Sequence, residues 1–205
     1  MKKPRALGLI LVALACASAA CSAPAAAPAT PGQSAQSASS ASGAAGAATG
    51  WALVPANGAA NIKAAGLEVL TSEGSAEHYH AHLDVYSDGS HVPVPADIGF
   101  SFGADGQPNG ISALHTHDTT GIVHVEAPVA GLTYTVGQVL TEWGVLGSNG
   151  SMPGSTISEW SVYINGAKQS GDPRSMVLAG HAEIALVHGS APADLPASYT
   201  FPSGY

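Results

Sequence analysis

Apolar and polar residues alternate between positions 78 and 85, which is the pattern of a β-strand with one buried and one polar face. We expect the apolar face to pack on a core. That face consists of Tyr79, Ala81, Leu83 and Val85. The polar face carries His78, His80, His82 and Asp84.

The residues after this strand predict a β-hairpin. Asp88-Gly89 favours a type I′ turn, in which both central residues have positive φ. A two-residue turn places Tyr86 opposite His91 and adds His91 to the histidine face. Because Pro93 has no N–H to donate, we expect the return strand to end there or to lie at an edge. Residues 96–110 are rich in Gly, Asp, Asn and Pro and are expected to form a loop.

A second histidine stretch, from Leu114 to Glu126, also divides into an apolar and a polar face. With Thr119-Thr120 as a two-residue turn, His115 lies directly opposite His124. A loop longer by one residue would shift this register. In the register with the shorter turn, one face holds His115, His117, His124 and Glu126.

The C-terminal half predicts one short helix and two strands. Thr135, with a glutamine three residues later, matches a capping box at the start of a helix that Gly144 would end. Residues 160–164 have a strand pattern, and the following Asn165-Gly166 favours a hairpin turn. Residues 182–187 form the last clear strand pattern of the chain.

Together these patterns predict an α+β fold with a mixed, mostly antiparallel sheet. Over residues 111–190 the order of elements resembles that of a β-grasp domain, as in ubiquitin-like sulfur carriers. The segments that carry this resemblance are Tyr134–Gly144, Val162–Gly166 and Glu183–Val187. It implies that residues 114–126 are the first hairpin of the unit and that residues 78–92 are an extra N-terminal hairpin. Sulfur carriers end in Gly-Gly, whereas this chain ends in Pro-Ser-Gly-Tyr, so the resemblance implies a fold and no activity.

The first fifty residues have the composition of a targeting segment and a tether. Residues 1–20 combine a basic start with a short apolar run and are expected to be a secretory signal. Cys21 follows small residues as in a bacterial lipobox, which predicts acylation; the alternative is signal cleavage near Ala20 without a lipid. Residues 21–50 contain no charge and are expected to be a disordered tether. Residues 51–205 suit a single globular domain.

The charge balance excludes one class of partner. Beyond the signal the chain has three basic and fourteen acidic residues, a net charge of −11 with histidine neutral. Such a surface repels phosphate backbones, so we expect no nucleic-acid binding. Contact with a membrane is expected only through the lipid anchor, which would place the domain outside the cytoplasm. The sequence does not identify a protein partner.

Several motifs resemble those of a family of secreted or lipid-anchored bacterial proteins without an established activity. They are His-x-His-Ala-His-Leu-Asp-Val at 78–85, Val-Pro-Val-Pro-Ala-x-Ile-Gly at 92–99, Leu-His-Thr-His-Asp-Thr-x-Gly-Ile-x-His-Val-Glu at 114–126 and Gly-Gln-x-x-x-x-Trp-Gly at 137–144. The resemblance implies an extracytoplasmic domain and no particular chemistry.

The spacing of the histidines predicts a metal site. Residues i and i+2 on a strand lie about 6.5 Å apart on one face, and directly opposed residues on antiparallel strands lie about 4.5–5.5 Å apart. Two imidazoles on one strand and one opposite can therefore share an ion. With no cysteine after position 21, nitrogen and oxygen ligands favour Cu²⁺ or Zn²⁺. The candidate ligands are His80, His82, His115, His117 and His124, with His78, Asp118 and Glu126 as possible additional or outer groups.

Four other interpretations of the cluster stay open. A three-histidine centre with an open position would suit a hydrolase or hydratase, with Glu126 or Asp118 as acid or base. Carboxylates could instead hold the rings in a hydrogen-bond network without a metal, or the cluster could titrate as a pH sensor. Finally, the histidines could be ordinary polar residues on an envelope interaction domain.

Overall fold

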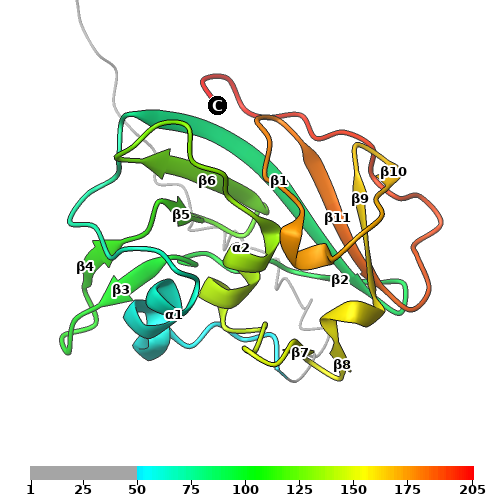
Figure 1. Cartoon of the computed structure of the whole chain (residues 1–205), viewed down its shortest axis with the longest axis horizontal. Helices are drawn as coiled ribbons and strands as arrows, with labels where there is room; N and C mark the ends of the chain where they lie inside the picture. The colour runs from blue at the N-terminus through cyan, green and yellow to red at the C-terminus, as the bar shows by residue number, and fades with distance from the viewer. Residues whose placement is uncertain (1–49) are drawn as a thin grey trace, which may run out of the picture. The chain divides into compact units, whose positions relative to one another are not determined.

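The computed structural model describes residues 50–205, so the predicted signal, the predicted acylation of Cys21 and the predicted tether up to residue 49 lie outside the described residues. The fold is α+β, as the sequence predicted (Figure 1). The helices are α1 (Gly58–Ala64) and α2 (Val136–Trp143), and short 3₁₀ turns span Pro55–Asn57, Ile157–Glu159 and Pro173–Ser175. The strands are β1 (Glu77–Ser87), β2 (Ser90–Val92), β3 (Phe100–Phe102), β4 (Pro108–Ile111), β5 (Leu114–His115), β6 (Ile122–Ala127), β7 (Ser151–Met152), β8 (Ser155–Thr156), β9 (Trp160–Ile164), β10 (Ala167–Lys168) and β11 (Glu183–His188).

The main sheet has the strand order β10-β9-β11-β1-β6-β5, with β2 paired to one end of β1. Strands β1 and β11 run parallel in its centre, and the other pairs are antiparallel. This is a β-grasp arrangement, with α2 between the second and third strands of the unit along the chain. The first strand of the unit is β1 rather than β5, which differs from the assignment that the resemblance implied. Strand β5 is instead an added edge strand beyond β6.

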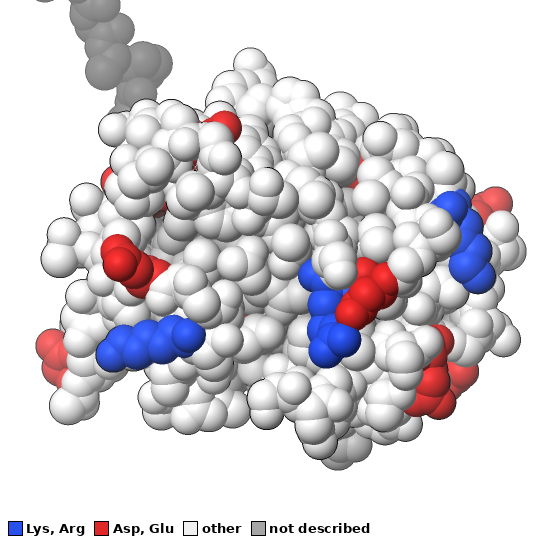
Figure 2. All heavy atoms as spheres, viewed as in Figure 1, with Lys and Arg blue, Asp and Glu red and all other residues white. Residues whose placement is uncertain are grey.

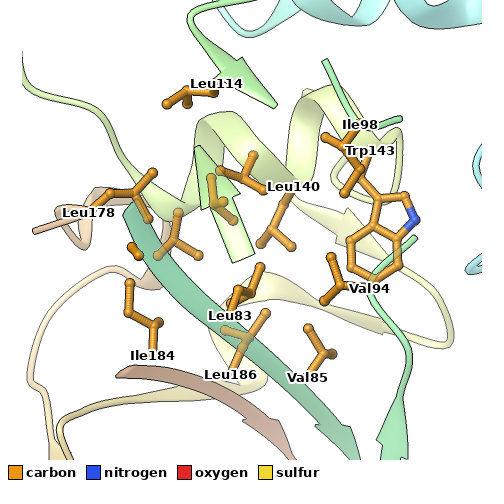
Figure 3. Packing of buried hydrophobic residues seen from close by; sticks show 14 of the residues in the cluster. Leu83, Val85, Val94, Ile98, Leu114, Leu140, Trp143, Leu178, Ile184 and Leu186 are labelled. Atoms are coloured by element: carbon orange, nitrogen blue, oxygen red, sulfur yellow. The ribbon is translucent and has the colours of Figure 1, made fainter. Parts of the chain in front are cut away.

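The apolar face of the sheet packs against α2 (Figure 3). Leu83 and Val85 of β1, and Leu186 of β11, lie in one core with Leu140 and Trp143 of α2. The alternation along β1 explains this arrangement, because every second side chain points to the same face. The opposite face is therefore left for the histidines.

Helix α2 begins and ends as predicted. The Thr135 side chain accepts a hydrogen bond from the Gln138 N–H, and the Gln138 side chain accepts one from the Thr135 N–H. Gly144 follows in the left-handed conformation with φ of +84°, which glycine adopts without a side-chain clash. The two Asx-Gly turns are also confirmed, since Asp88 and Asn165 both have a φ of +50°.

The sequence patterns missed two short strand pairs and one helix. Residues 96–110 were expected to be a loop, but β3 and part of β4 form a two-stranded sheet there. Strand β4 contains Pro108 and Gly110, and the three-residue β3 lies between Gly99 and Gly103, so the composition of the segment is typical of a loop. Helix α1 was not predicted, although it contacts α2. A further two-residue strand pair, β7 with β8, lies within a Gly- and Ser-rich segment.

Few charged side chains lie on the face shown in Figure 2, and the basic ones lie apart from one another. Arg174 pairs with Asp172, with 2.6 Å between Nη2 and Oδ2. Within residues 50–205, no helix is both long and apolar enough to cross a bilayer.

Candidate metal centre

The register of three neighbouring strands brings the two histidine stretches together. His80 of β1 lies opposite His124 of β6, and His124 also lies opposite His115 of β5. The predicted pairing of His115 with His124 is confirmed, as is that of Tyr86 with His91. The sequence left open whether the two stretches are adjacent, and the direct pairing of β1 with β6 shows that they are.

His115, His117 and His124 form the first group of convergent ligands. One ring nitrogen from each lies within 4.8 Å of the others. A tetrahedral ion with bonds of about 2.0–2.1 Å separates its nitrogen ligands by about 3.4 Å, so small ring movements would complete the geometry. His115 and His124 are buried, whereas the side chain of His117 is 43% exposed. The group therefore has one open side.

His115 is the best-defined ligand candidate. Its Nδ1 lies 3.1 Å from the main-chain oxygen of Ser112. Since a carbonyl only accepts, Nδ1 carries the proton and Nε2 keeps its lone pair. That Nε2 is buried and has no hydrogen-bond partner. Burial and then the neighbouring His117 lower the pKa of His115 to about 3, so the ring stays neutral at pH 7.

His124 is oriented in a similar way by a carboxylate. Its Nδ1 lies 3.1 Å from Glu126 Oε1 and 3.1 Å from His80 Nε2. A proton on Nδ1 satisfies the carboxylate and leaves Nε2 as the nitrogen that can bind a metal. Burial and the neighbouring His117 lower the pKa of His124 to about 4.

Glu73 is a candidate ligand that the sequence analysis missed. Its Oε1 lies 3.5 Å from Nε2 of His117 and 3.8 Å from Nε2 of His115. Its side chain is 48% exposed, on the open side of the group. Glu73 is a single acid in a turn outside both histidine stretches, so no local pattern marks it.

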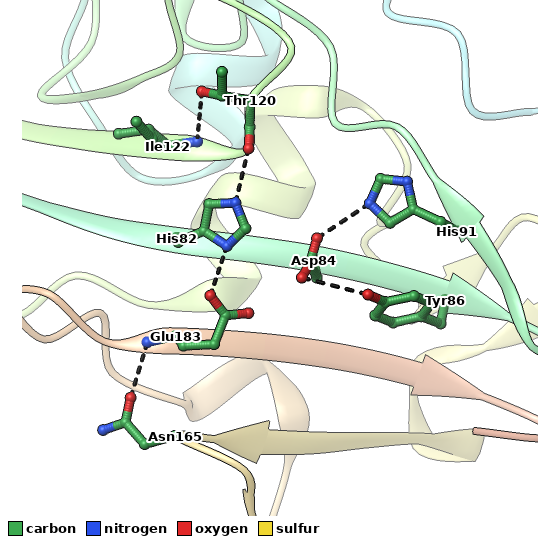
Figure 4. A network of polar contacts seen from close by, with 8 residues as sticks. All are labelled: His82, Asp84, Tyr86, His91, Thr120, Ile122, Asn165 and Glu183. Atoms are coloured by element: carbon green, nitrogen blue, oxygen red, sulfur yellow. Dashed lines mark hydrogen bonds and ion pairs between the residues drawn. The ribbon is translucent and has the colours of Figure 1, made fainter. Parts of the chain in front are cut away.

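His82, one of the predicted ligands, does not join this group. Its Nδ1 lies 2.7 Å from Glu183 Oε2, and its Nε2 lies 2.7 Å from the Thr120 carbonyl oxygen (Figure 4). Burial lowers the pKa of His82, but the contacts with Glu183, Thr120 and Asp84 together outweigh burial and raise the pKa overall. Both nitrogens donate to these acceptors here, and His82 forms a separate group with Asp84 and Glu183, whose ligand atoms lie within 4.8 Å of one another.

Asp118, predicted as an additional or outer group, is not among the convergent ligand groups within residues 50–205. It lies in the turn between β5 and β6 and is exposed. Its Oδ1 accepts a hydrogen bond from the Thr120 N–H at 2.8 Å and another from the Thr120 hydroxyl. The carboxylate therefore stabilises the turn that brings His124 back opposite His115.

A second group lies beside the first on β1 and β6. His78, His80 and Glu126 each offer a ligand atom, and these atoms lie within 4.8 Å of one another. His78 Nε2 is 3.4 Å from Glu126 Oε1, and its side chain is 56% exposed. Burial and then His124 lower the pKa of His80 to about 4, which favours its neutral form.

The segment after β11 covers part of the histidine face. The ring of Tyr205 lies 4.6 Å from that of His80 and 5.4 Å from that of His124. Tyr199 stacks on His82 with 3.7 Å between ring centroids. Tyr205 therefore packs on two rings of the cluster, and Tyr199 packs on the neighbouring His82.

Comparison with protein-family models, with curated protein sequences and with solved structures found no match to this chain. The histidine clusters are therefore the features that indicate what this protein does.

Proposed function

We propose that this protein is a metal-binding module of the cell envelope. It holds Cu²⁺ or Zn²⁺ at His115, His117 and His124, with Glu73 at the open side. The single observation that carries the proposal is the buried Nε2 of His115, which has a lone pair and no hydrogen-bond partner. A buried polar atom without a partner is costly, and a metal ion bound there would remove that cost.

The donor set supports a borderline first-row ion. Three imidazoles and a carboxylate suit Zn²⁺ and Cu²⁺, whereas Mg²⁺ and Ca²⁺ prefer oxygen ligands. The two hydrogen bonds from Nδ1, to Ser112 in one ring and to Glu126 in the other, are the outer contacts that commonly fix metal-binding histidines. A non-metal hydrogen-bond network is less well supported, because it leaves Nε2 of His115 unsatisfied.

The location in the cell envelope is proposed from the N-terminal sequence. The basic and apolar start, the small residues before Cys21 and the uncharged segment to residue 50 are typical of a lipid-anchored, tethered domain. The likeness of its motifs to secreted bacterial proteins supports the same location. A module of this kind would buffer, deliver or sense metal outside the cytoplasm.

The proposal is tested by the metal content of protein purified without chelators or a nickel column. After loading with Zn²⁺ or Cu²⁺ and desalting, we expect the wild type to retain bound metal. The His117→Ala variant should lose the ion held by His115, His117 and His124. His91→Ala is the matched control, since both side chains are partly exposed, at 43% and 49%. At 100 times the dissociation constant, metal should stabilise the fold by about 2.7 kcal/mol. Wild-type protein that retains below about 0.2 ion per chain under these conditions contradicts the proposal, since structural sites bind tightly.

A metal-dependent hydrolase or hydratase is the second candidate. A hollow of about 390 Å³ lies beside the open side of the centre, and its lining includes Glu73 and Phe100. The ring of Phe100 lies 5.8 Å from that of His115 and 5.7 Å from that of His117. Glu73 would be the general base for a metal-bound water. Hydrolysis of ester or phosphoester probes by the Zn²⁺ protein, abolished in Glu73→Gln with metal retained, would favour this candidate.

A further inference from the structure

The geometry points to a second metal site, formed by His78, His80 and Glu126, that adjoins the first site and makes the centre a two-ion centre. The three ligand atoms lie within 4.8 Å of one another. The ligand class is again nitrogen and oxygen, so the ion is a first-row divalent cation such as Zn²⁺ or Cu²⁺. The inference rests on the proposed function in one respect, because His124 lies against both sites.

Glu126 is the group around which the second site is built. Its side chain is 10% exposed, and its Oε1 is 3.4 Å from His78 Nε2 and 3.1 Å from His124 Nδ1. Both of these neighbours on β1 and β6 are imidazoles. A largely buried carboxyl group that faces imidazole nitrogens is a favourable place for a first-row divalent cation.

His80 and His124 give a second reason for a cation at this position. His80 Nε2 and His124 Nδ1 are only 3.1 Å apart, and Glu126 Oε1 also lies 3.1 Å from His124 Nδ1. Without an ion, a single proton on Nδ1 has to serve both acceptors. With an ion in the second site, His80 and Glu126 bind the metal, and they no longer depend on that shared proton.

The second site is accessible from solvent at one ligand only. His78 is 56% exposed, whereas His80 and Glu126 are buried. The Tyr205 ring packs on His80 at 4.6 Å between ring centroids. An ion would therefore enter past His78 and then reach the buried His80 and Glu126. Pairing of β1 with β6 places Glu126 directly opposite His78.

The number of ions bound tests this inference. We expect isothermal titration with Zn²⁺, checked by elemental analysis, to give two ions per chain for the wild type. His78→Ala should bind one ion, His117→Ala should bind one ion, and the His91→Ala control should bind two. His78 and His117 are both partly exposed, so their removal should leave the fold intact, which circular dichroism and thermal unfolding would verify.

Each alternative outcome separates the two proposals. One ion in the wild type that His78→Ala retains and His117→Ala loses would overturn the second site and leave the proposed function standing. One ion that only His78→Ala loses would overturn the three-histidine site instead. Two ions in His78→Ala would overturn the second site as drawn, and no ion in the wild type would overturn both. With Cu²⁺, a two-ion centre should also give a smaller electron paramagnetic resonance signal per copper than His78→Ala, because neighbouring Cu²⁺ ions couple.

Discussion

Glu142 should make the stability of this domain fall as the pH rises through neutrality. The side chain belongs to α2, is 1% exposed, and neither carboxyl oxygen has a hydrogen-bond partner. Burial raises the pKa of Glu142 to about 8; the nearby Ser112 hydroxyl acts in the opposite direction but does not complete a hydrogen bond. The folded protein therefore holds a neutral carboxyl group at pH 7, whereas the unfolded chain holds a charged one.

The size of the effect follows from the difference between the two pKa values. An unfolded glutamate titrates near 4.5, and each unit of difference is worth about 1.36 kcal/mol. Below pH 4.5 Glu142 is protonated in both the folded and the unfolded state, so its titration does not change the free energy of unfolding. As the pH rises toward 8, the unfolded state loses its proton first, so the folded state is disfavoured by up to about 1.4 kcal/mol per pH unit. At pH 7 the accumulated cost is about 3 kcal/mol.

Urea unfolding at pH 5, 6, 7 and 8 measures this effect. The Glu142→Gln variant keeps the size of the side chain but does not titrate, so the variant should gain stability over the wild type by about 3.5 kcal/mol between pH 5 and pH 8. Glu68→Gln is the control, because Glu68 is exposed. A difference between Glu142→Gln and wild type that stays constant over this pH range would refute the reasoning, since titration of residue 142 would then be the same in both states.

Three further substitutions test the fold around the site by urea unfolding. His82→Gln should destabilise the domain by about 3–5 kcal/mol, because it leaves the buried Glu183 charge without its partner; a loss below about 1 kcal/mol would contradict a charged pair. Thr135→Ala should cost about 1 kcal/mol through loss of the helix cap, and an unchanged midpoint would argue against the capping box. Gly99→Ala should cost more than about 2 kcal/mol, because φ is +77° and the new Cβ would lie 2.0 Å from the Leu114 main-chain oxygen; a neutral result would show that the β5 strand can shift.

Local rules predicted the parts of the site that lie within one hairpin or one strand. The alternation over residues 78–85 determined which side chains of β1 face the core and which face the histidines. The predicted opposition of His115 and His124 is confirmed, although residues 116–121 connect the two strands in place of the expected two-residue turn at Thr119-Thr120. The Asp88-Gly89 turn likewise predicted the pairing of Tyr86 with His91. Each of these relations joins residues fewer than ten positions apart.

Relations between distant segments could not be predicted in the same way. Glu73 reaches the centre from a turn before β1, and Ser112 orients His115 with a main-chain oxygen that any residue type would supply. The parallel pairing of β1 with β11 joins residues about a hundred positions apart. The resemblance to a β-grasp domain predicted the fold class, but it placed the first strand of the unit at residue 114. The first hairpin is instead formed by β1 and β6, which a long connection separates along the chain.

His80 and His82 show why a histidine pattern alone does not identify ligands. They are two residues apart on one strand, face the same side of the sheet and are both buried. His80 lies against His124, and burial with neighbouring imidazoles lowers its pKa to about 4. His82 lies against Glu183, which raises its pKa and occupies one of its nitrogens. The neighbouring side chain therefore determines which ring keeps a lone pair, and it comes from β6 for His80 and from β11 for His82. Predicting the ligands requires the order of the strands in the sheet, which the spacing along β1 does not give.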